Sequence, residues 1–273
     1  MTQKELNEIF EAVYYGNITL DNLPDPLYFY YAKELQKAVN KGFNSSLKLL
    51  PVDSPEWDLL NHFRENTNIF SGAKTFQQIK DSQNFILDAQ GELRPFNDYL
   101  KDVRKIDAVY RESWLQVERD TAISQGQSAR KWMDIESQKD ILSYLVFRTQ
   151  GDGRVRDEHA ALEGFTAKVD DPAWNSLTPP IDWNDRCYLE QIQEAVETTK
   201  EQKQGIIQQM NVGREKPIKN FNDIPPPLFR MNPAKDKIIF KNEGIGSHPY
   251  FKVDQAYEVL KTNNFGVDIN YVI

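Results

Sequence analysis

One short stretch of this 273-residue sequence gathers most of the side chains that could do chemistry. Residues 148–164 read RTQGDGRVRDEHAALEG, without the spacing of a G-x-x-x-x-G-K-[ST] phosphate loop or of a G-x-G-x-x-G dinucleotide fingerprint. The formal charges of its arginines and of the acids that precede its histidine cancel, so we expect a network of local ion pairs rather than a phosphate cradle. These charged residues are Arg148, Arg154, Arg156, Asp152, Asp157 and Glu158.

His159, in the same stretch, raises the questions of nucleophilic catalysis and of metal binding. A Cys–His pair would need Cys187, the single cysteine, within hydrogen-bond reach of His159, and sequence does not show such geometry. If residues 185–190 form a strand, Asp185 and Cys187 point to the same side, and with His159 they offer oxygen, sulfur and nitrogen ligands. A structural zinc site takes four ligands, and no fourth is apparent. We therefore expect no catalytic residue, no cofactor and no bound metal, with His159 hydrogen-bonded at the start of a short helical turn.

The composition excludes several classes of protein. Apolar residues make up 40% and charged residues 27%, which is ordinary for a chain that buries a core. The net charge of −8 argues against a bulk nucleic-acid or membrane-surface binder, so any DNA contact would need a local basic patch. The apolar run at 27–32 is far too short to span a membrane, and the N-terminus lacks the basic start and apolar centre of a signal peptide.

The hydrophobic pattern predicts an α+β protein. The first third reads as helices, with Gly72 expected to separate two of them. A long helix is expected over about 97–133, where apolar residues recur every three or four positions and make a buried stripe. Residues 143–149, GFTAKV and DRCYLEQI are strand candidates, followed by a helix from about 191 to Gly213. The members of the stripe are Leu100, Val103, Ile106, Tyr110, Trp114, Val117 and Thr121.

The C-terminal part has a different composition. Six of the fourteen prolines lie between Pro217 and Pro249, which favours an extended arm, and the arm also carries aromatic residues that should lie on a surface. The ending NNFGVDINYVI alternates in the period of a strand. We expect three regions: N-terminal helices at 1–96, a domain at 97–212 with its small α+β core within about 110–190, and an extended proline-rich arm at 213–273 that ends in a strand.

The order of residues in the middle region resembles the phage head morphogenesis family, the minor head proteins similar to protein F of bacteriophage Mu. That family carries an aromatic–Arg–Thr segment, a Gly-Asp turn, Arg-Val-Arg and His-x-x-Leu-x-Gly, then an Asp-Pro-x-Trp element, a Pro-Pro-x-x-Trp turn and a Cys-Arg-Cys end. The resemblance covers about 110–190 and assigns a structural role to these motif residues: Glu118, Arg148, Asp152, Arg154, Arg156, His159, Gly164, Asp171, Trp174, Pro180, Trp183, Arg186 and Cys187.

One departure from the family pattern bears on metal binding. The Cys-Arg-Cys end is Asp185-Arg186-Cys187 here. A carboxylate is a harder ligand than a thiolate, so the change weakens the case for zinc. If the pair serves packing instead, Asp185 should face solvent or pair with an arginine.

The resemblance implies a non-enzymatic minor head protein of a tailed phage or prophage, made in the bacterial cytoplasm and located in the virion head. Its implied partners are the portal protein and other head proteins, with roles in head assembly and in DNA packaging or delivery. Two alternatives stay open. One is a toxin-type enzyme, a nuclease or other effector carried on such a domain, although the short, proline-broken tail suits an arm better. The other is a metal- or nucleic-acid-binding module, which the net charge disfavours.

Overall fold

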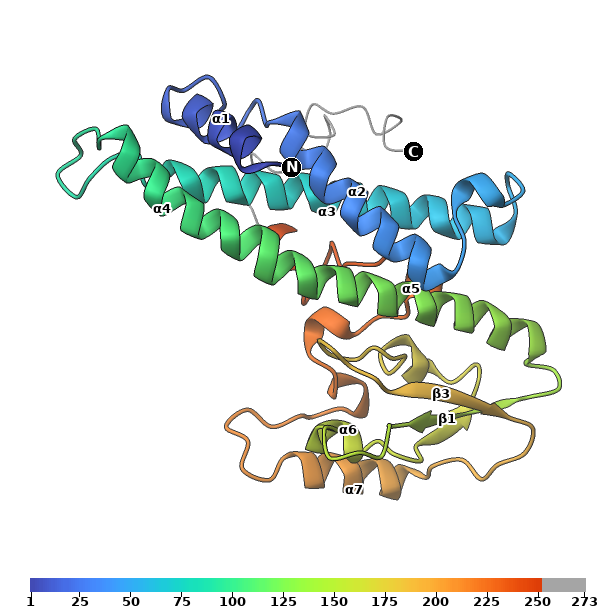
Figure 1. The fold of residues 1–273 in the computed structure, drawn as a ribbon. Coiled ribbons are helices and arrows are strands. Elements are labelled where there is room, and N and C mark those ends of the chain that lie inside the picture. Colours follow the sequence, from blue (N-terminus) through green and yellow to red (C-terminus); the bar gives the residue numbers. More distant parts are fainter. Residues whose placement is uncertain (252–273) are drawn as a thin grey trace.

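The computed structural model describes residues 1–251 and shows a layer of long helices above a small lobe that contains a sheet (Figure 1). The helical layer consists of α1 (Gln3–Tyr14), α2 (Asp25–Phe43), α3 (Pro55–Gln83), α4 (Phe96–Ala108) and α5 (Leu115–Gln138). The lobe contains β1 (Tyr144–Arg148), α6 (Asp157–Ala160), β2 (Thr166–Lys168), β3 (Tyr188–Ile192) and α7 (Lys200–Met210), and later α8 (Pro233–Asp236). These elements confirm the α+β class.

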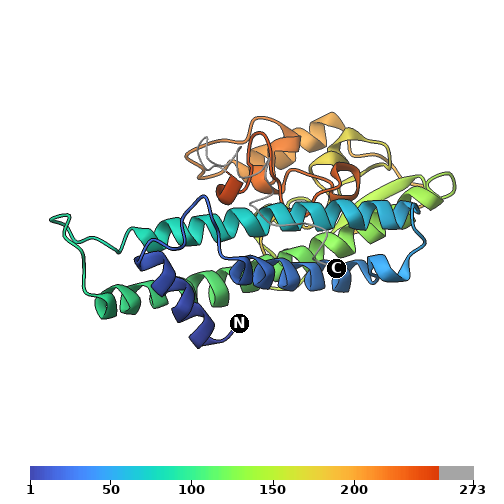
Figure 2. The ribbon, with the colours of Figure 1, turned by 90° about the horizontal axis from the view of Figure 1, so that it is seen from above.

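The helical layer is held by one apolar core and by a close crossing of α2 and α5. Figure 2 shows α2, α3 and the α4–α5 helix running lengthwise beside one another. At the crossing, a Cβ added to Gly42 of α2 would collide with the carbonyl oxygen of Ile123 in α5. A Cβ added to Gly126 would lie 2.9 Å from the carbonyl oxygen of Val39. Glycine at both positions therefore allows the two backbones to approach each other.

The long helix predicted from the stripe is present, but its buried face shifts partway along. Residues Val109–Trp114 form a π-helical turn between α4 and α5. Such a turn adds one residue to the helix and rotates the later residues about the helix axis. Beyond it the buried face passes through Leu115 and Glu118, while Trp114 is 44% exposed. The prediction that Trp114 belongs to the buried stripe was therefore wrong.

Two other sequence-based expectations about helices were also wrong. Helix α3 continues through Gly72, which is buried inside it. The helix expected from about 191 begins only at Lys200, where Thr199 and Gln202 form a capping box. Before that point Thr198 N–H donates to the carbonyl oxygen of Thr166, and Thr166 N–H donates to the Thr198 hydroxyl, each at 2.9 Å, so Thr198 lies beside β2.

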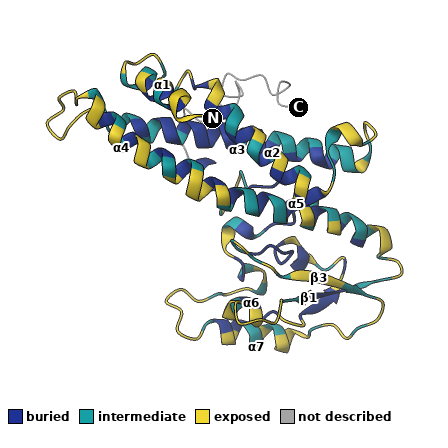
Figure 3. Cartoon of the chain, viewed as in Figure 1, coloured by how far each residue is buried: buried dark blue, intermediate teal, exposed yellow. Residues whose placement is uncertain are grey.

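The sheet confirms the three predicted strands. Its order is β2-β1-β3, with both pairings antiparallel. The central strand β1 is buried along its middle, as Figure 3 shows. Trp132 and Ile135 of α5 belong to the same apolar core as the sheet, and the Gln191 side chain donates to the carbonyl oxygens of Ile135 and Leu142 at 2.9 and 2.8 Å. The small lobe therefore rests on the last turns of the long helix.

The proline-rich segment after α7 lies on its own protein, across both cores. It is not uniformly extended, because short helical turns interrupt it, for example at Pro227–Phe229 and in α8. Phe221 packs on Phe165 of the lobe with ring centroids 4.8 Å apart. Phe240 stacks on Phe70 of α3 at 3.9 Å. The predicted terminal strand lies outside the described residues.

None of the helices within residues 1–251 has the length and apolar character that a membrane span requires.

Candidate functional site

The stretch 148–164 forms the corner between β1 and the chain that returns to β2. Gly164 has φ +78°, a left-handed conformation that glycine adopts without strain. From this position its N–H donates to the carbonyl oxygen of Phe147 at 2.9 Å, and Phe147 N–H donates to the carbonyl oxygen of Phe165 at 2.8 Å. The corner thus continues the pairing of β1 with β2 one residue beyond Val146, and it brings α6 beside the segment that precedes β3.

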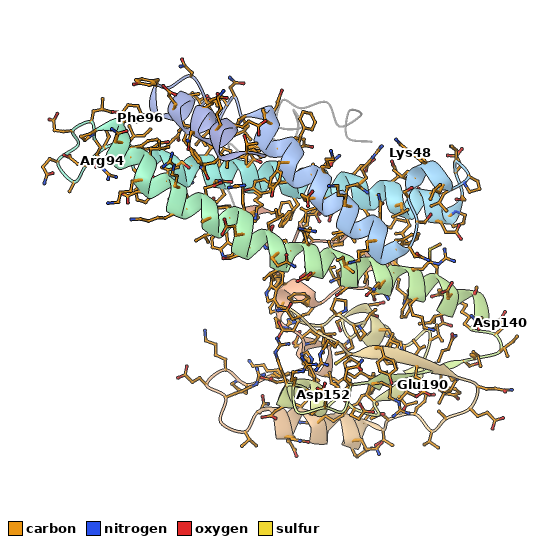
Figure 4. All side chains as sticks on the ribbon, in the orientation of Figure 1. Lys48, Arg94, Phe96, Asp140, Asp152 and Glu190 are labelled. Carbon is orange, nitrogen blue, oxygen red and sulfur yellow. The ribbon has the colours of Figure 1, made fainter. Side chains whose placement is uncertain are left out.

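The predicted ion pairs exist, although their partners come mostly from outside the stretch. At the end of β1, Arg148 contacts Glu163 at 3.1 Å and Glu190 of β3 at 2.7 Å. Asp152 receives two hydrogen bonds from Arg186, at 2.7 and 2.8 Å. These bonds hold the pKa of the Asp152 carboxyl well below its usual value. Figure 4 labels Asp152 and Glu190, which both lie in the lobe that contains the sheet.

Arg156 and Glu158 of the corner are also paired. Arg156 lies 3.4 Å from Asp182 and donates to the carbonyl oxygen of Trp183 at 2.8 Å. Glu158 pairs with Arg214 at 2.8 Å. Because all these side chains are partly exposed, each pair adds little stability alone. Together they fix the corner to the loop that precedes β3 and to the segment after α7.

At the centre of the corner, three side chains that the sequence singled out meet. His159 Nδ1 lies 3.1 Å from Asp185 Oδ1 and 3.5 Å from Cys187 Sγ. The Asp185 side chain is fully buried, and that of His159 is 7% exposed. Backbone N–H groups hold the carboxylate in place, from Ile181 to Oδ2 and from Cys187 to Oδ1, each at 2.9 Å. Each of the three side chains could offer one ligand atom to a metal ion.

The electrostatics of this cluster disfavour a nucleophilic cysteine. Burial raises the pKa of the Cys187 thiol, and the neighbouring Asp185 carboxylate raises it further. For Asp185 itself, burial acts to raise the pKa, but hydrogen bonds from His159, Cys187 and Ile181 outweigh burial and lower it. At neutral pH the cluster therefore places a carboxylate and a protonated thiol beside the His159 ring. Because the thiolate is the reactive form of cysteine, this arrangement is a poor nucleophile.

The structure corrects the expected surroundings of Asp185. Its carboxylate neither faces solvent nor pairs with an arginine, because His159 and two backbone N–H groups occupy it. Strand β3 begins only at Tyr188, so strand alternation does not bring Asp185 and Cys187 together. Instead, the turn closed by the Cys187 N–H bond to Asp185 does so.

The other motif residues of the lobe act in packing and capping. Asp171 accepts from Ala173 N–H at 2.7 Å and caps the turn Pro172–Asn175. Trp174 is buried in the lobe core and donates to the carbonyl oxygen of Lys168 at 2.8 Å. Pro180 follows a cis peptide bond. Trp183 packs against Phe229 of the proline-rich segment, with ring centroids 5.0 Å apart.

Glu118 belongs to a second buried polar cluster, which the sequence did not reveal. Its carboxylate contacts Lys74 Nζ of α3 at 2.7 and 2.8 Å, and the two side chains are 4% and 0% exposed. The ammonium also lies 4.9 Å from the centre of the Tyr31 ring and 5.4 Å from that of Tyr250. Burial lowers the pKa of Lys74 and raises that of Glu118, and each partner offsets part of the other's shift. The family resemblance singled out Glu118, but the sequence gave no indication of its pairing with Lys74.

Comparison with known proteins covers all of the first cluster and Glu118 of the second. Residues 89–190 match the family model described as Phage Mu protein F like protein. A Mu-like prophage FluMu F protein of Haemophilus influenzae is 31% identical over 80 residues, which are 29% of this chain and 18% of that protein. The putative capsid assembly protein F of Escherichia phage Mu is 30% identical over 105 residues, 38% of this chain and 21% of that protein.

The match therefore spans about a fifth of the length of each of these curated relatives. No solved structure matches the chain. The matched residues contain the end of the loop after α3, the whole α4–α5 helix and the sheet up to the middle of β3. The resemblance to the phage Mu F-like proteins is thus confirmed for residues 89–190.

Proposed function

We propose that this chain is a structural minor head protein of a tailed phage or prophage that acts in head assembly. The observation that carries the proposal is the match of residues 89–190 to the Mu F-like family, because these residues build the α4–α5 helix and the paired corner as one continuous unit. The name of the phage Mu relative, a putative capsid assembly protein, agrees with this role. Other head proteins are then the partners, and the virion head is the location.

A finer proposal places the protein near the portal, where it would act in DNA packaging or delivery. This part rests on the family resemblance alone. Direct DNA contact has little support from the net charge of −8. The corner also offers no free basic patch for DNA, since each of its arginines contacts an acid.

The experiment is a deletion of the gene in the phage or prophage that encodes it. We expect mass spectrometry to find the chain in purified heads, and electron microscopy to find fewer DNA-filled heads after deletion. Complementation with the wild-type gene should restore filled heads. Absence of the chain from heads, with an unchanged yield of filled heads after deletion, would overturn the proposal.

The portal location has its own test. Amine-reactive cross-linking of purified particles should join exposed lysines such as Lys48 and Lys101 to the portal protein. Cross-links only to the major capsid shell would refute the location and leave the head role intact.

The toxin-type enzyme remains the alternative. Residues 213–251 pack on the two cores and build no further core of their own within the described chain. Expression of the full chain in a bacterium without the phage tests this alternative directly. Arrest of growth on induction would favour an effector, and normal growth would favour the structural role.

A further inference from the structure

The cluster of His159, Asp185 and Cys187 has the donor atoms of a zinc site. Imidazole nitrogen, carboxylate oxygen and cysteine sulfur are the three kinds of ligand that zinc takes in proteins. They come from two segments, α6 and the loop before β3, that are far apart in sequence and meet in a largely buried place. All the ligand atoms lie within 4.8 Å of one another.

The two distances from His159 Nδ1 to the other ligand atoms are close to the edges of a tetrahedron around zinc. Zinc bonds of about 2.0–2.1 Å to nitrogen and oxygen and about 2.3 Å to sulfur give edges of about 3.4 Å between nitrogen and oxygen and about 3.5 Å between nitrogen and sulfur. The observed separations are 3.1 Å from His159 Nδ1 to Asp185 Oδ1 and 3.5 Å to Cys187 Sγ. A zinc ion would need only small side-chain movements.

The carboxylate is already oriented for such a role. Ile181 N–H holds one oxygen and Cys187 N–H donates to the other, so the side chain cannot rotate away without losing both bonds. A carboxylate oxygen has two lone pairs that can accept hydrogen bonds or bind a metal. In Asp185 Oδ1, one lone pair accepts from Cys187 N–H, and the other is directed toward His159. Hydrogen bonds of this kind orient metal ligands in known sites.

A fourth ligand has room to enter. A cavity of about 310 Å³ opens beside the cluster and is lined by its three side chains. Three arginines also line this cavity, and each contacts Asp152 or Asp182. With Asp185, the three carboxylates cancel the formal charge of the three arginines, so the arginines leave no net positive charge to repel a cation. These six residues are Arg154, Arg156, Arg186, Asp152, Asp182 and Asp185.

We propose that His159, Asp185 and Cys187 bind one zinc ion, with water from this cavity as the fourth ligand. The sequence-based expectation was the opposite, because it required a fourth protein ligand and gave a carboxylate low weight. A site with three protein ligands and one water needs no fourth residue. The ion would join α6 to the loop before β3 at the centre of the corner. This proposal does not depend on the head function.

The test measures zinc binding to the purified full chain. After removal of metal with a chelator, equilibrium dialysis against zinc and elemental analysis should give about one zinc per chain. We expect at least about tenfold weaker binding in Cys187→Ser and in His159→Gln. The matched control is His62→Gln, since the His62 side chain is 41% exposed on α3, and this variant should bind zinc as the wild type does.

Two further measurements on the wild type keep the test independent of how the variants fold. Zinc should raise its melting temperature. Cobalt in place of zinc should give the near-ultraviolet absorption of a cobalt–thiolate bond. Saturable zinc binding that is equal in all variants, or cobalt binding without the thiolate absorption, would overturn the proposal, as would failure of the folded wild type to bind zinc.

Discussion

The buried Lys74–Glu118 pair permits a quantitative prediction about stability. In Glu118→Gln the amide still accepts a hydrogen bond, but the ammonium of Lys74 loses its counter-charge in a place where both side chains are 4% exposed or less. Removing one partner of a buried ion pair costs about 3–5 kcal/mol. The cost has a ceiling, because Lys74 can release its proton instead. Moving an amine pKa from about 10.4 to below 7 corresponds to about 4–5 kcal/mol.

We therefore expect Glu118→Gln to lower the free energy of unfolding at pH 7 by about 3–5 kcal/mol. Lys74→Met combined with Glu118→Gln should recover most of this loss, since it removes the unpaired charge. The assay is urea unfolding followed by circular dichroism, with Glu112→Gln as the control because Glu112 is an exposed acid of the same long helix.

The pH dependence of the single variant separates this account from a simple packing defect. In Glu118→Gln the unpaired Lys74 has a lower pKa in the folded protein than in the unfolded one. The unfolded state then binds more protons at neutral pH, so stability should rise from pH 7 to pH 9. A loss under about 1 kcal/mol, or a stability that does not rise with pH, would refute the reasoning.

Further predictions concern the helix crossing, the corner and the C-terminal segment. Gly42→Ala should lower the free energy of unfolding in urea by about 1–3 kcal/mol or more, because the new Cβ collides with α5. The control is Gly205→Ala in α7, which has open space around it and should leave the stability unchanged or raise it. In the chelator-treated protein, the pKa of Asp185 is lower in the folded state than its ordinary value of 3.8. The ionised carboxylate therefore stabilises the fold above pH 3.8, and this stabilisation is lost as the pH falls further. Acid titration of Asp185→Asn should therefore show a shallower loss than the wild type. Asn66→Ala removes three hydrogen bonds to the backbone of residues 239–240. Limited proteolysis at a fixed temperature should then cut the chain around these residues faster in the variant than in the wild type.

The sequence predicted those features that depend on local pattern. Short segments with apolar residues predicted β1, β2 and β3, and the run that became β1 ends shortly before a glycine turn. The charge balance around Asp152 gave the ion pairs of the corner. The partners from outside the stretch, such as Arg186, could not be assigned, because they lie far away in the sequence and meet the corner only in the folded lobe.

Other features depend on contacts that no local pattern contains. A single π-helical turn rotates the buried face and leaves Trp114 exposed, although the apolar spacing continues through it. Helix α3 tolerates Gly72 because it is buried among neighbouring helices, where packing overrides propensity. Lys74 gave no signal, because its partner lies 44 residues away in the sequence. The meeting of His159 with Asp185 likewise depends on a turn that closes only in the folded lobe.

The return of the C-terminal segment to α3 has a consequence for synthesis on the ribosome. Phe240, Tyr250 and Phe251 belong to the apolar core of the N-terminal helices. A nascent chain that has emerged only as far as α7 therefore lacks part of that core and leaves Phe70 and the Lys74–Glu118 pair without their cover. The earliest helices translated reach their final packing only after nearly the last described residues have emerged. The core of the N-terminal helices is thus completed only after the middle lobe has been translated.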